Sequence, residues 1–169
     1  MDILLVMNPQ NSFFSHKGAV YMGEKAEILK IRLDDFLKSF SKTKIFLREA
    51  HAMEDDFFTT DKTHSITNSD DFKIHNALKK HADIVENKIR YSALFKTAIL
   101  EELVNKKVKH VGLVGVETHT SILFTAEELR NRTYEVTVVE PCTMARDDYM
   151  HSYAITLMRH SLGVRITDG

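Results

Sequence analysis

The sequence has 169 residues, of which 43% are hydrophobic and 28% charged, and its formal net charge at pH 7 is −1. These values are typical of a globular protein, and the near-neutral charge argues against nucleic acid or a membrane surface as a partner. We therefore expect one domain over residues 1–169, with no nucleic acid and no membrane among its partners. The single cysteine, Cys142, excludes an internal disulfide, and together with an N-terminus that lacks an export signal it predicts a cytoplasmic location.

Strands and helices are predicted to alternate along the chain. Short apolar runs predict strands at 3–7, 44–47, 83–86, 111–114, 135–139 (stopped by Pro141) and 164–166. Apolar residues three or four positions apart predict helices at 24–40, 72–81, 97–106, 118–129 and 147–160. The polar stretch 48–71 predicts a long loop, which is either functional or disordered. This alternation predicts an α/β fold with three αβα layers and a mostly parallel, six-stranded, doubly wound sheet.

The stretch 108–129, VKHVGLVGVETHTSILFTAEEL, organises the rest of the chain. A buried strand runs through a tight turn at Gly115 into a helix whose first turn holds Thr118, Thr120 and Ser121. The N-terminus of a helix presents unpaired N–H groups and a partial positive charge, which stabilise an anion. Any chemistry of this chain is therefore expected near Ser121.

Polar residues follow several other predicted strands. Asn8 comes after the first strand, Glu49 and His51 after the second, and Lys88 after the third. In an open parallel sheet the carboxyl ends of the strands meet at one edge, where ligands bind. These residues and Ser121 are therefore expected to converge there.

Four segments occur in the order LLVMNPQNSFF, NKIRYSALFKTAILEEL, VGLVGVETHTSILFTAEEL and EVTVVEPCTMARDDYMHSYAITLMR. In this order they resemble the isochorismatase-like hydrolases, also called the cysteine hydrolase superfamily, and especially nicotinamidases. The resemblance implies a hydrolase of a small molecule, and it implies assembly into a homo-oligomer. It places the family's catalytic aspartate, lysine and cysteine at Asn8, Lys88 and Ser121. It also implies a cis peptide at Val116–Glu117 and substrate or oxyanion binding by Phe13, Val116, Glu117 and Thr118.

Two of the three catalytic positions depart from the family pattern. Asn8 cannot accept a proton near neutral pH, and a serine hydroxyl such as that of Ser121 is a weaker nucleophile than a thiol. Three hypotheses follow: a hydrolase that is weak or inactive towards ordinary amides, an active hydrolase of a small amide, ester or vinyl ether in which Lys88 activates Ser121, and a non-catalytic binding or scaffold protein.

A second resemblance concerns a metal site. Nicotinamidases carry an Asp-x-His motif after the second strand and a further histidine later, and here Glu49, His51 and His64 stand in the matching places, with His75 beyond them. Two histidines and a carboxylate suit zinc, iron or manganese. The resemblance implies a divalent metal as cofactor, and the alternative is that these are exposed polar residues of the loop.

Overall fold

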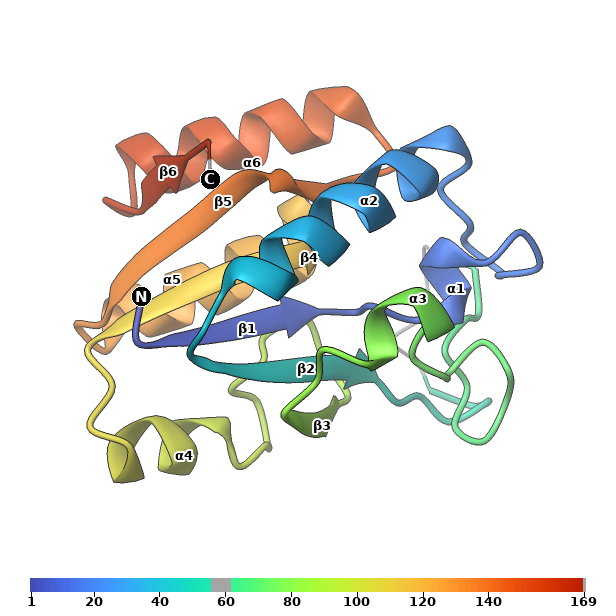
Figure 1. Ribbon diagram of the computed structural model, residues 1–169, viewed down its shortest axis with the longest axis horizontal. Coiled ribbons are helices and arrows are strands. Elements are labelled where there is room, and N and C mark those ends of the chain that lie inside the picture. The colour runs from blue at the N-terminus through green and yellow to red at the C-terminus, as the bar shows by residue number, and fades with distance from the viewer. Residues whose placement is uncertain (56–61, 169) are drawn as a thin grey trace.

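The computed structural model describes residues 1–55 and 62–168, which form a three-layer α/β structure around a six-stranded sheet (Figure 1). The strand order is β3-β2-β1-β4-β5-β6, and every strand pair is parallel. The strands are β1 (Ile3–Met7), β2 (Thr43–Glu49), β3 (Ile84–Lys88), β4 (His110–Val116), β5 (Glu135–Met144) and β6 (Arg165–Thr167). The helices are α1 (Asn11–Phe14), α2 (Glu24–Ser39), α3 (Asn76–Lys79), α4 (Ile99–Asn105), the π-helical turn η2 (Thr118–Ile122), α5 (Leu123–Asn131) and α6 (Asp148–His160).

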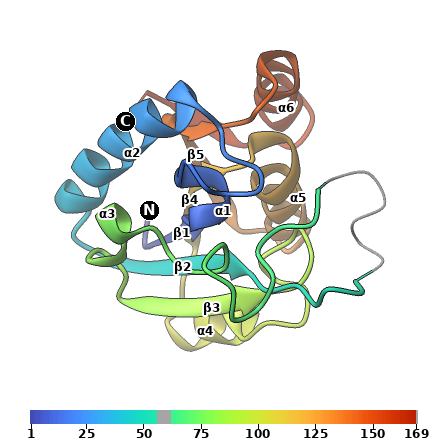
Figure 2. The same ribbon diagram turned by 90° about the vertical axis from the view of Figure 1, so that its right-hand side faces the viewer.

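The central strand β1 shows why helices cover both faces of the sheet. Successive side chains of a strand point to opposite faces. Ile3, Leu5 and Met7 pack in one core with residues of α4, α5 and α6, whereas Leu4 and Val6 pack in a second core with residues of α1, α2 and α3. Figure 2 shows α2 and α3 on one side of the sheet and α5 and α6 on the other. The predicted doubly wound αβα fold is confirmed. In the described residues, no helix is both long and apolar enough to cross a membrane.

The helix predicted at 72–81 is wrong in length, because only Asn76–Lys79 is helical. The residues before it hydrogen-bond to a distant segment instead: Ile74 forms an antiparallel bridge with Gln10, and the His75 N–H donates to Pro9 O over 2.8 Å. The His75 ring then caps the short helix by accepting a hydrogen bond from the Ala77 N–H. Long-range backbone pairing therefore overrides the local helical pattern.

The predicted stop at Pro141 is also wrong, since β5 continues to Met144. Proline cannot donate a backbone hydrogen bond to a neighbouring strand. Here β6 pairs only with Thr137–Val139, and the register with β4 shifts between Leu113 and Gly115, so that neither neighbour requires an N–H at Pro141. An irregular stretch of β5 thus tolerates the residue that was expected to end it.

The carboxyl ends of β1 and β4 approach each other closely, and Gly115 makes this approach possible. Its φ is +107°, and a Cβ atom at this position would lie 2.2 Å from Met7 O. Only glycine fits such a combination of backbone angle and contact. The close approach brings the residue after β1 next to the turn after β4, which is the edge of the sheet seen end-on in Figure 2.

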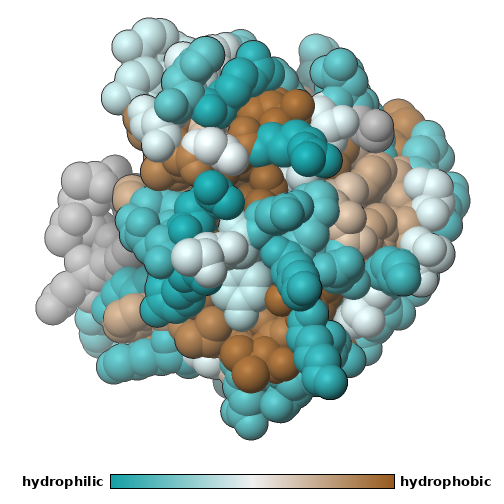
Figure 3. All heavy atoms as spheres, turned by 90° about the vertical axis from the view of Figure 1, so that its left-hand side faces the viewer, coloured by the Kyte–Doolittle hydropathy of each residue, from teal (hydrophilic) through white to brown (hydrophobic). Residues whose placement is uncertain are grey.

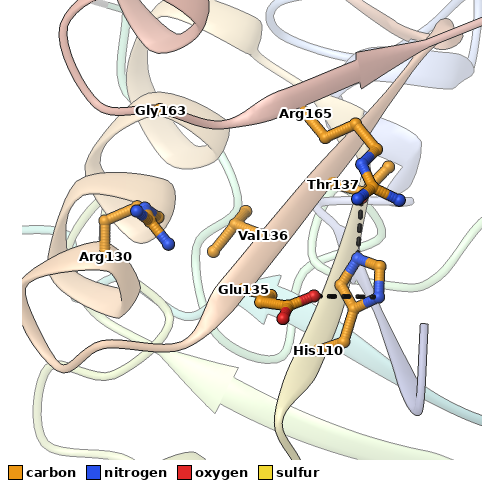
Figure 4. A pocket seen from close by; sticks show the side chains of 7 residues that line it. All are labelled: His110, Arg130, Glu135, Val136, Thr137, Gly163 and Arg165. Carbon is orange, nitrogen blue, oxygen red and sulfur yellow. Dashed lines mark hydrogen bonds and ion pairs between the residues drawn. The ribbon is translucent and has the colours of Figure 1, made fainter.

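The opposite edge, where the strands begin, carries a separate polar pocket (Figure 4). The pocket has a volume of about 150 Å³. Its lining comes from the starts of β4, β5 and β6 and from the end of α5, and includes His110, Arg130, Glu135 and Arg165. The sequence analysis assigned no role to these residues. Seen from this side, the surface carries polar and hydrophobic residues interspersed (Figure 3).

Candidate active site and metal-binding cluster

Asn8 is held at the carboxyl edge by the backbone that follows β1. Its N–H donates to Leu47 O over 2.8 Å, and its φ is +49°. Asparagine tolerates this left-handed conformation better than most residues do. The turn directs the side chain, which is only 1% exposed, towards the interior of the edge.

The structure brings together the three residues predicted as catalytic. The Ser121 hydroxyl oxygen accepts a hydrogen bond from Asn8 Nδ2 over 3.0 Å and another from Lys88 Nζ over 3.1 Å. Ser121 lies in η2, directly after β4, and is fully buried. Two donors thus point at the oxygen that would carry negative charge during an attack on a substrate.

Glu49, expected only as a metal ligand, lies at the centre of these residues. Its Oε1 accepts hydrogen bonds from Asn8 Nδ2 at 2.8 Å and from Lys88 Nζ at 3.0 Å. The same oxygen lies 3.4 Å from Ser121 Oγ, which donates to it. The other oxygen, Oε2, lies 2.9 Å from His64 Nε2. One carboxylate therefore contacts both the predicted catalytic residues and the predicted metal ligands.

Gln10 fixes the position of Glu49, a role that the sequence analysis missed. Its side-chain oxygen accepts the Glu49 N–H over 2.7 Å, and its Nε2 donates to Glu49 O over 2.9 Å and to Phe72 O over 3.1 Å. The fully buried amide thus pairs with the backbone of Glu49 as a neighbouring strand would. No local sequence pattern predicts this contact, because the two residues are 39 positions apart in the sequence.

Lys88 has the hydrogen bonding of a protonated amine. Its Nζ donates to Glu49 Oε1, to Ser121 Oγ and, over 3.1 Å, to Arg90 O, which accounts for the three protons of an ammonium group. Burial lowers the pKa of Lys88, and the attraction of Glu49 opposes this shift. For the Glu49 carboxyl, burial alone raises the pKa, but Lys88 and the two histidines outweigh it and hold the pKa well below its ordinary value.

The predicted metal ligands also lie together. Glu49, His51 and His64 are buried, and one ligand atom from each lies within 4.8 Å of the others. The Nδ1 atom of His64 lies 2.7 Å from Lys62 O, which suits a histidine whose Nε2 faces an ion. Two imidazoles and one carboxylate are a donor set that zinc, iron and manganese accept. The side chains present therefore fit a divalent ion, while His75 lies apart and caps α3.

The residues predicted to bind the substrate or the oxyanion make several different kinds of contact. The Phe13 ring, 2% exposed, packs edge-on against the His64 ring with 5.4 Å between centroids. The peptide bond between Val116 and Glu117 is cis, as the resemblance implied. The backbone N–H, Nε and Nη2 of Arg146 donate hydrogen bonds to the Glu117 carboxylate over 2.9 to 3.0 Å. Thr118 Oγ1 lies 2.8 Å from His151 Nδ1.

The Glu117 and Thr118 side chains are therefore engaged by residues that follow β5. The sequence did not indicate these partners, since Arg146 and His151 belong to the start of α6 and the loop before it. Their contacts connect the turn after β4 to the last helix.

Comparison with known proteins shows the family and the fold of the chain. The isochorismatase domain family matches residues 2–168, nearly the whole chain. The chain belongs to the isochorismatase family. Among curated members, the uncharacterized isochorismatase family protein YaaI of Bacillus subtilis (strain 168) is 30% identical over 86 residues, which are 51% of this chain and 48% of that protein. The match thus spans about half the length of each protein.

Solved structures of nicotinamidases and pyrazinamidases share the fold along the full chain. The nicotinamidase/pyrazinamidase PncA from Bacillus subtilis superimposes with a TM-score of 0.89 at 21% identity, covering 98% of both chains. A pyrazinamidase of Pyrococcus horikoshii in complex with zinc superimposes with a TM-score of 0.88 at 20% identity, covering 99% of this chain and 98% of that one. At such identities the likeness establishes the fold.

Proposed function

We propose that this isochorismatase-family protein is a slow hydrolase of a small amide, in which Ser121 attacks the carbonyl carbon. One observation carries the proposal: the Ser121 hydroxyl lies within 3.0 to 3.4 Å of Asn8 Nδ2, Lys88 Nζ and Glu49 Oε1. Two donors and one acceptor thus surround the oxygen that must lose a proton and carry charge. The reaction is slow because a serine replaces the stronger thiol nucleophile and an asparagine replaces the acid.

The Asn8 side chain supports an amide over an ester as substrate. Its Nδ2 is occupied by Glu49 and Ser121, whereas among the described residues its buried Oδ1 has no hydrogen-bond partner. A buried acceptor that is left without a partner costs about 1–3 kcal/mol. The N–H of an amide substrate satisfies this oxygen, and an ester offers no such donor.

The remaining groups have separate roles in the proposed reaction. The Lys88 ammonium supports negative charge on Ser121 Oγ, and backbone N–H groups of the Val116–Ser121 segment hold the oxyanion, except that of Thr120, which donates to Glu117 O. Phe13 forms an apolar wall beside His64. A divalent ion held by the cluster of Glu49, His51 and His64 would polarise or orient a nitrogen-containing substrate. Nicotinamide and pyrazinamide are suitable first substrates because related structures are of nicotinamidases and pyrazinamidases.

The test is hydrolysis of nicotinamide, pyrazinamide, benzamide and the methyl ester of nicotinic acid by the purified protein. We expect slow release of ammonia from an amide, less turnover of the ester, and loss of amide turnover in both Ser121→Ala and Lys88→Met. The Asn8→Asp/Ser121→Cys variant restores a thiol and a second carboxylate, and we expect it to be at least about 10-fold faster. Turnover that persists in Ser121→Ala would contradict the proposal.

The inability of Asn8 to accept a proton favours a second candidate, a non-catalytic protein that binds a ligand at the same carboxyl edge. The same panel separates the two candidates. If the natural protein hydrolyses no amide and the Asn8→Asp/Ser121→Cys variant does, the ligand site is intact and only the catalytic groups have been lost. If neither protein hydrolyses any substrate of the panel, a binding or scaffold role is favoured.

Metal binding is tested separately from activity. We expect the metal-free protein to bind about one zinc ion, measured by isothermal titration and by elemental analysis after dialysis, and His64→Ala to weaken binding by about 10-fold or more. His75→Ala is the matched control, because its ring caps α3 and should leave zinc binding unchanged. Equal affinity in the natural protein and in His64→Ala would exclude the cluster as the site.

We also propose that the protein is a cytoplasmic homo-oligomer. Cys142 is a free, buried thiol, which suits a reducing compartment. The stacked Tyr149 and Tyr153 rings on α6 are 73% and 53% exposed and offer an aromatic contact between subunits. Sedimentation velocity of the natural protein checks this point, and a monomer at micromolar concentration would contradict it.

A further inference from the structure

The two oxygens of the Glu49 carboxylate face different chemistry. Oε2 lies on the side of the histidines, 2.9 Å from His64 Nε2. Oε1 lies on the side of the nucleophile, where it accepts hydrogen bonds from Asn8 and Lys88 and lies 3.4 Å from Ser121 Oγ. A carboxylate oxygen offers about two lone-pair sites, so Asn8, Lys88 and Ser121 share Oε1, with Ser121 the most distant of the three.

The other two neighbours of the Ser121 hydroxyl are unsuited to accept its proton. Asn8 presents its NH₂ group to the hydroxyl, and an amide has no basic site near neutral pH. Lys88 presents an ammonium whose three protons all point at acceptors. In the part of the chain that the structure describes, Glu49 is the carboxylate that hydrogen-bonds to Ser121.

We propose that Glu49 is a catalytic residue that accepts the proton of Ser121, in place of an acid at position 8; this rests on the function proposed above. As the Ser121 Oγ–carbon bond forms, the Oγ–H bond breaks and the proton moves to Glu49 Oε1. The proton then passes to the substrate nitrogen as the carbon–nitrogen bond breaks, so that the amine leaves neutral. Water cleaves the acyl-serine ester in the second half of the reaction, which releases the acid and returns the proton to Ser121.

The backbone contacts of Glu49 fix its position beside Ser121. Its backbone is held on both sides by the Gln10 amide, with hydrogen bonds of 2.7 and 2.9 Å, and its side chain is 4% exposed. A general base must lie within hydrogen-bond reach of the proton that it removes, and apo distances are often longer than those of the reacting complex. The 3.4 Å between Glu49 Oε1 and Ser121 Oγ is slightly longer than the roughly 2.6–3.2 Å of a reacting pair, and a small approach of the two groups closes the difference.

The inference is tested with a fluorophosphonate probe, which phosphonylates an activated serine and is followed by intact-protein mass. Labelling at Ser121 releases fluoride and requires the same removal of the hydroxyl proton, but needs no amide substrate. Chelator in every arm keeps the result independent of metal. We expect Glu49→Gln to label at least about 100-fold more slowly than the natural protein, since general bases contribute about 10²–10⁴-fold. Ser121→Ala gives the blank.

A second variant separates loss of the base from loss of the fold. Glu49→Gln leaves the buried Lys88 ammonium without its carboxylate, whereas Asn8→Asp/Glu49→Gln restores one acid beside Lys88 and Ser121. We expect this exchange to recover at least about 10-fold of the lost labelling rate. Labelling of Glu49→Gln within about threefold of the natural rate, or a folded exchange variant that recovers nothing, overturns the inference.

The outcomes also distinguish this inference from the function on which it rests. If Ser121 is labelled in a Glu49-dependent way but no amide is hydrolysed, the proposed substrate class fails and the role of Glu49 stands. If amides are hydrolysed and Glu49→Gln is labelled like the natural protein, the function stands and the role of Glu49 fails. A natural protein that is not labelled at Ser121 overturns the inference, and amide turnover then judges the function alone.

Discussion

A hydroxyl attacks a carbonyl only when its proton has an acceptor, and at the residue scale this requirement gives Glu49 its importance. Position 8 carries an amide and position 49 carries the longer of the two acidic side chains. The extra carbon lets the carboxylate reach Lys88 and Ser121 as well as His64. The residues at positions 8 and 49, where the chain departs from the aspartates of the family pattern, therefore lie in direct contact.

Cys142 shows the opposite case, a potential nucleophile that burial makes inert. Its Sγ lies 3.6 Å from Arg32 O, and burial raises the pKa of the thiol to about 11. A shift of about two pKa units leaves about 100-fold less thiolate at pH 8. We expect iodoacetamide to modify the folded protein about 100-fold more slowly than the urea-unfolded protein, measured by intact mass. Equal rates in the two states would show that the thiol is accessible and ionised.

At the scale of the elements, the carboxyl edge depends on how closely β1 and β4 approach. Asn8 and the turn holding Ser121 come within hydrogen-bond distance because Gly115 has no side chain at the crossing. The same edge depends on the bridge from Ile74 to Gln10, which shortens α3 and keeps Gln10 beside Glu49. Packing between elements thus positions the site more directly than any single helix or strand does.

Gly115→Ala tests this close approach. We expect it to lower the free energy of unfolding by at least about 2 kcal/mol, because the new Cβ combines an unfavourable φ with a contact to Met7 O. Gly163→Ala is the matched control: its φ is also positive, at +64°, but its nearest contact is the flexible Arg130 side chain at 3.5 Å. Urea unfolding measures both variants, and similar losses would mean that the contact with β1 is unimportant.

At the scale of the whole molecule, acidic side chains tie distant parts of the chain together. Asp34 on α2 accepts hydrogen bonds from Lys38, from Lys80 at 2.9 Å and from His81 at 2.7 Å, and thereby links α2 to the segment that follows α3. Hydrogen bonding to Lys38, His81 and Lys80 holds the pKa of Asp34 well below its ordinary value. The backbone N–H of Lys44 likewise lowers the pKa of Asp83.

These shifts predict a stability that falls in acid. A carboxyl whose pKa is lower in the folded state than in the unfolded state stabilises the fold above its unfolded pKa of about 4, and this contribution is lost as the pH falls further. We expect the contribution of Asp34 to the urea midpoint, measured as the difference between the natural protein and Asp34→Asn, to be nearly constant from about pH 7 to pH 5 and to fall below about pH 4. Asp34→Asn should flatten the fall, whereas an unchanged pH profile in this variant would exclude Asp34 as a contributor.

The sequence alone determined the order of elements, the parallel sheet and the residues that gather at its carboxyl edge. Short apolar runs and helical spacing of apolar residues encode local structure, and alternating strands and helices leave few ways to form a sheet. Residues at the ends of strands or directly after them must then meet at one edge, so that the convergence of Asn8, Lys88 and Ser121 could be predicted before their distances were known.

Only the tertiary structure decided the extent of α3 and β5 and the orientation of Glu49. These features depend on hydrogen bonds between residues far apart in the sequence, such as Asn8 with Glu49 at 41 positions and Asn8 with Ser121 at 113 positions. Local patterns carry no information about which distant partner satisfies a buried polar group. The direction of each Glu49 oxygen was therefore fixed by packing, because every donor around the carboxylate comes from a different part of the chain.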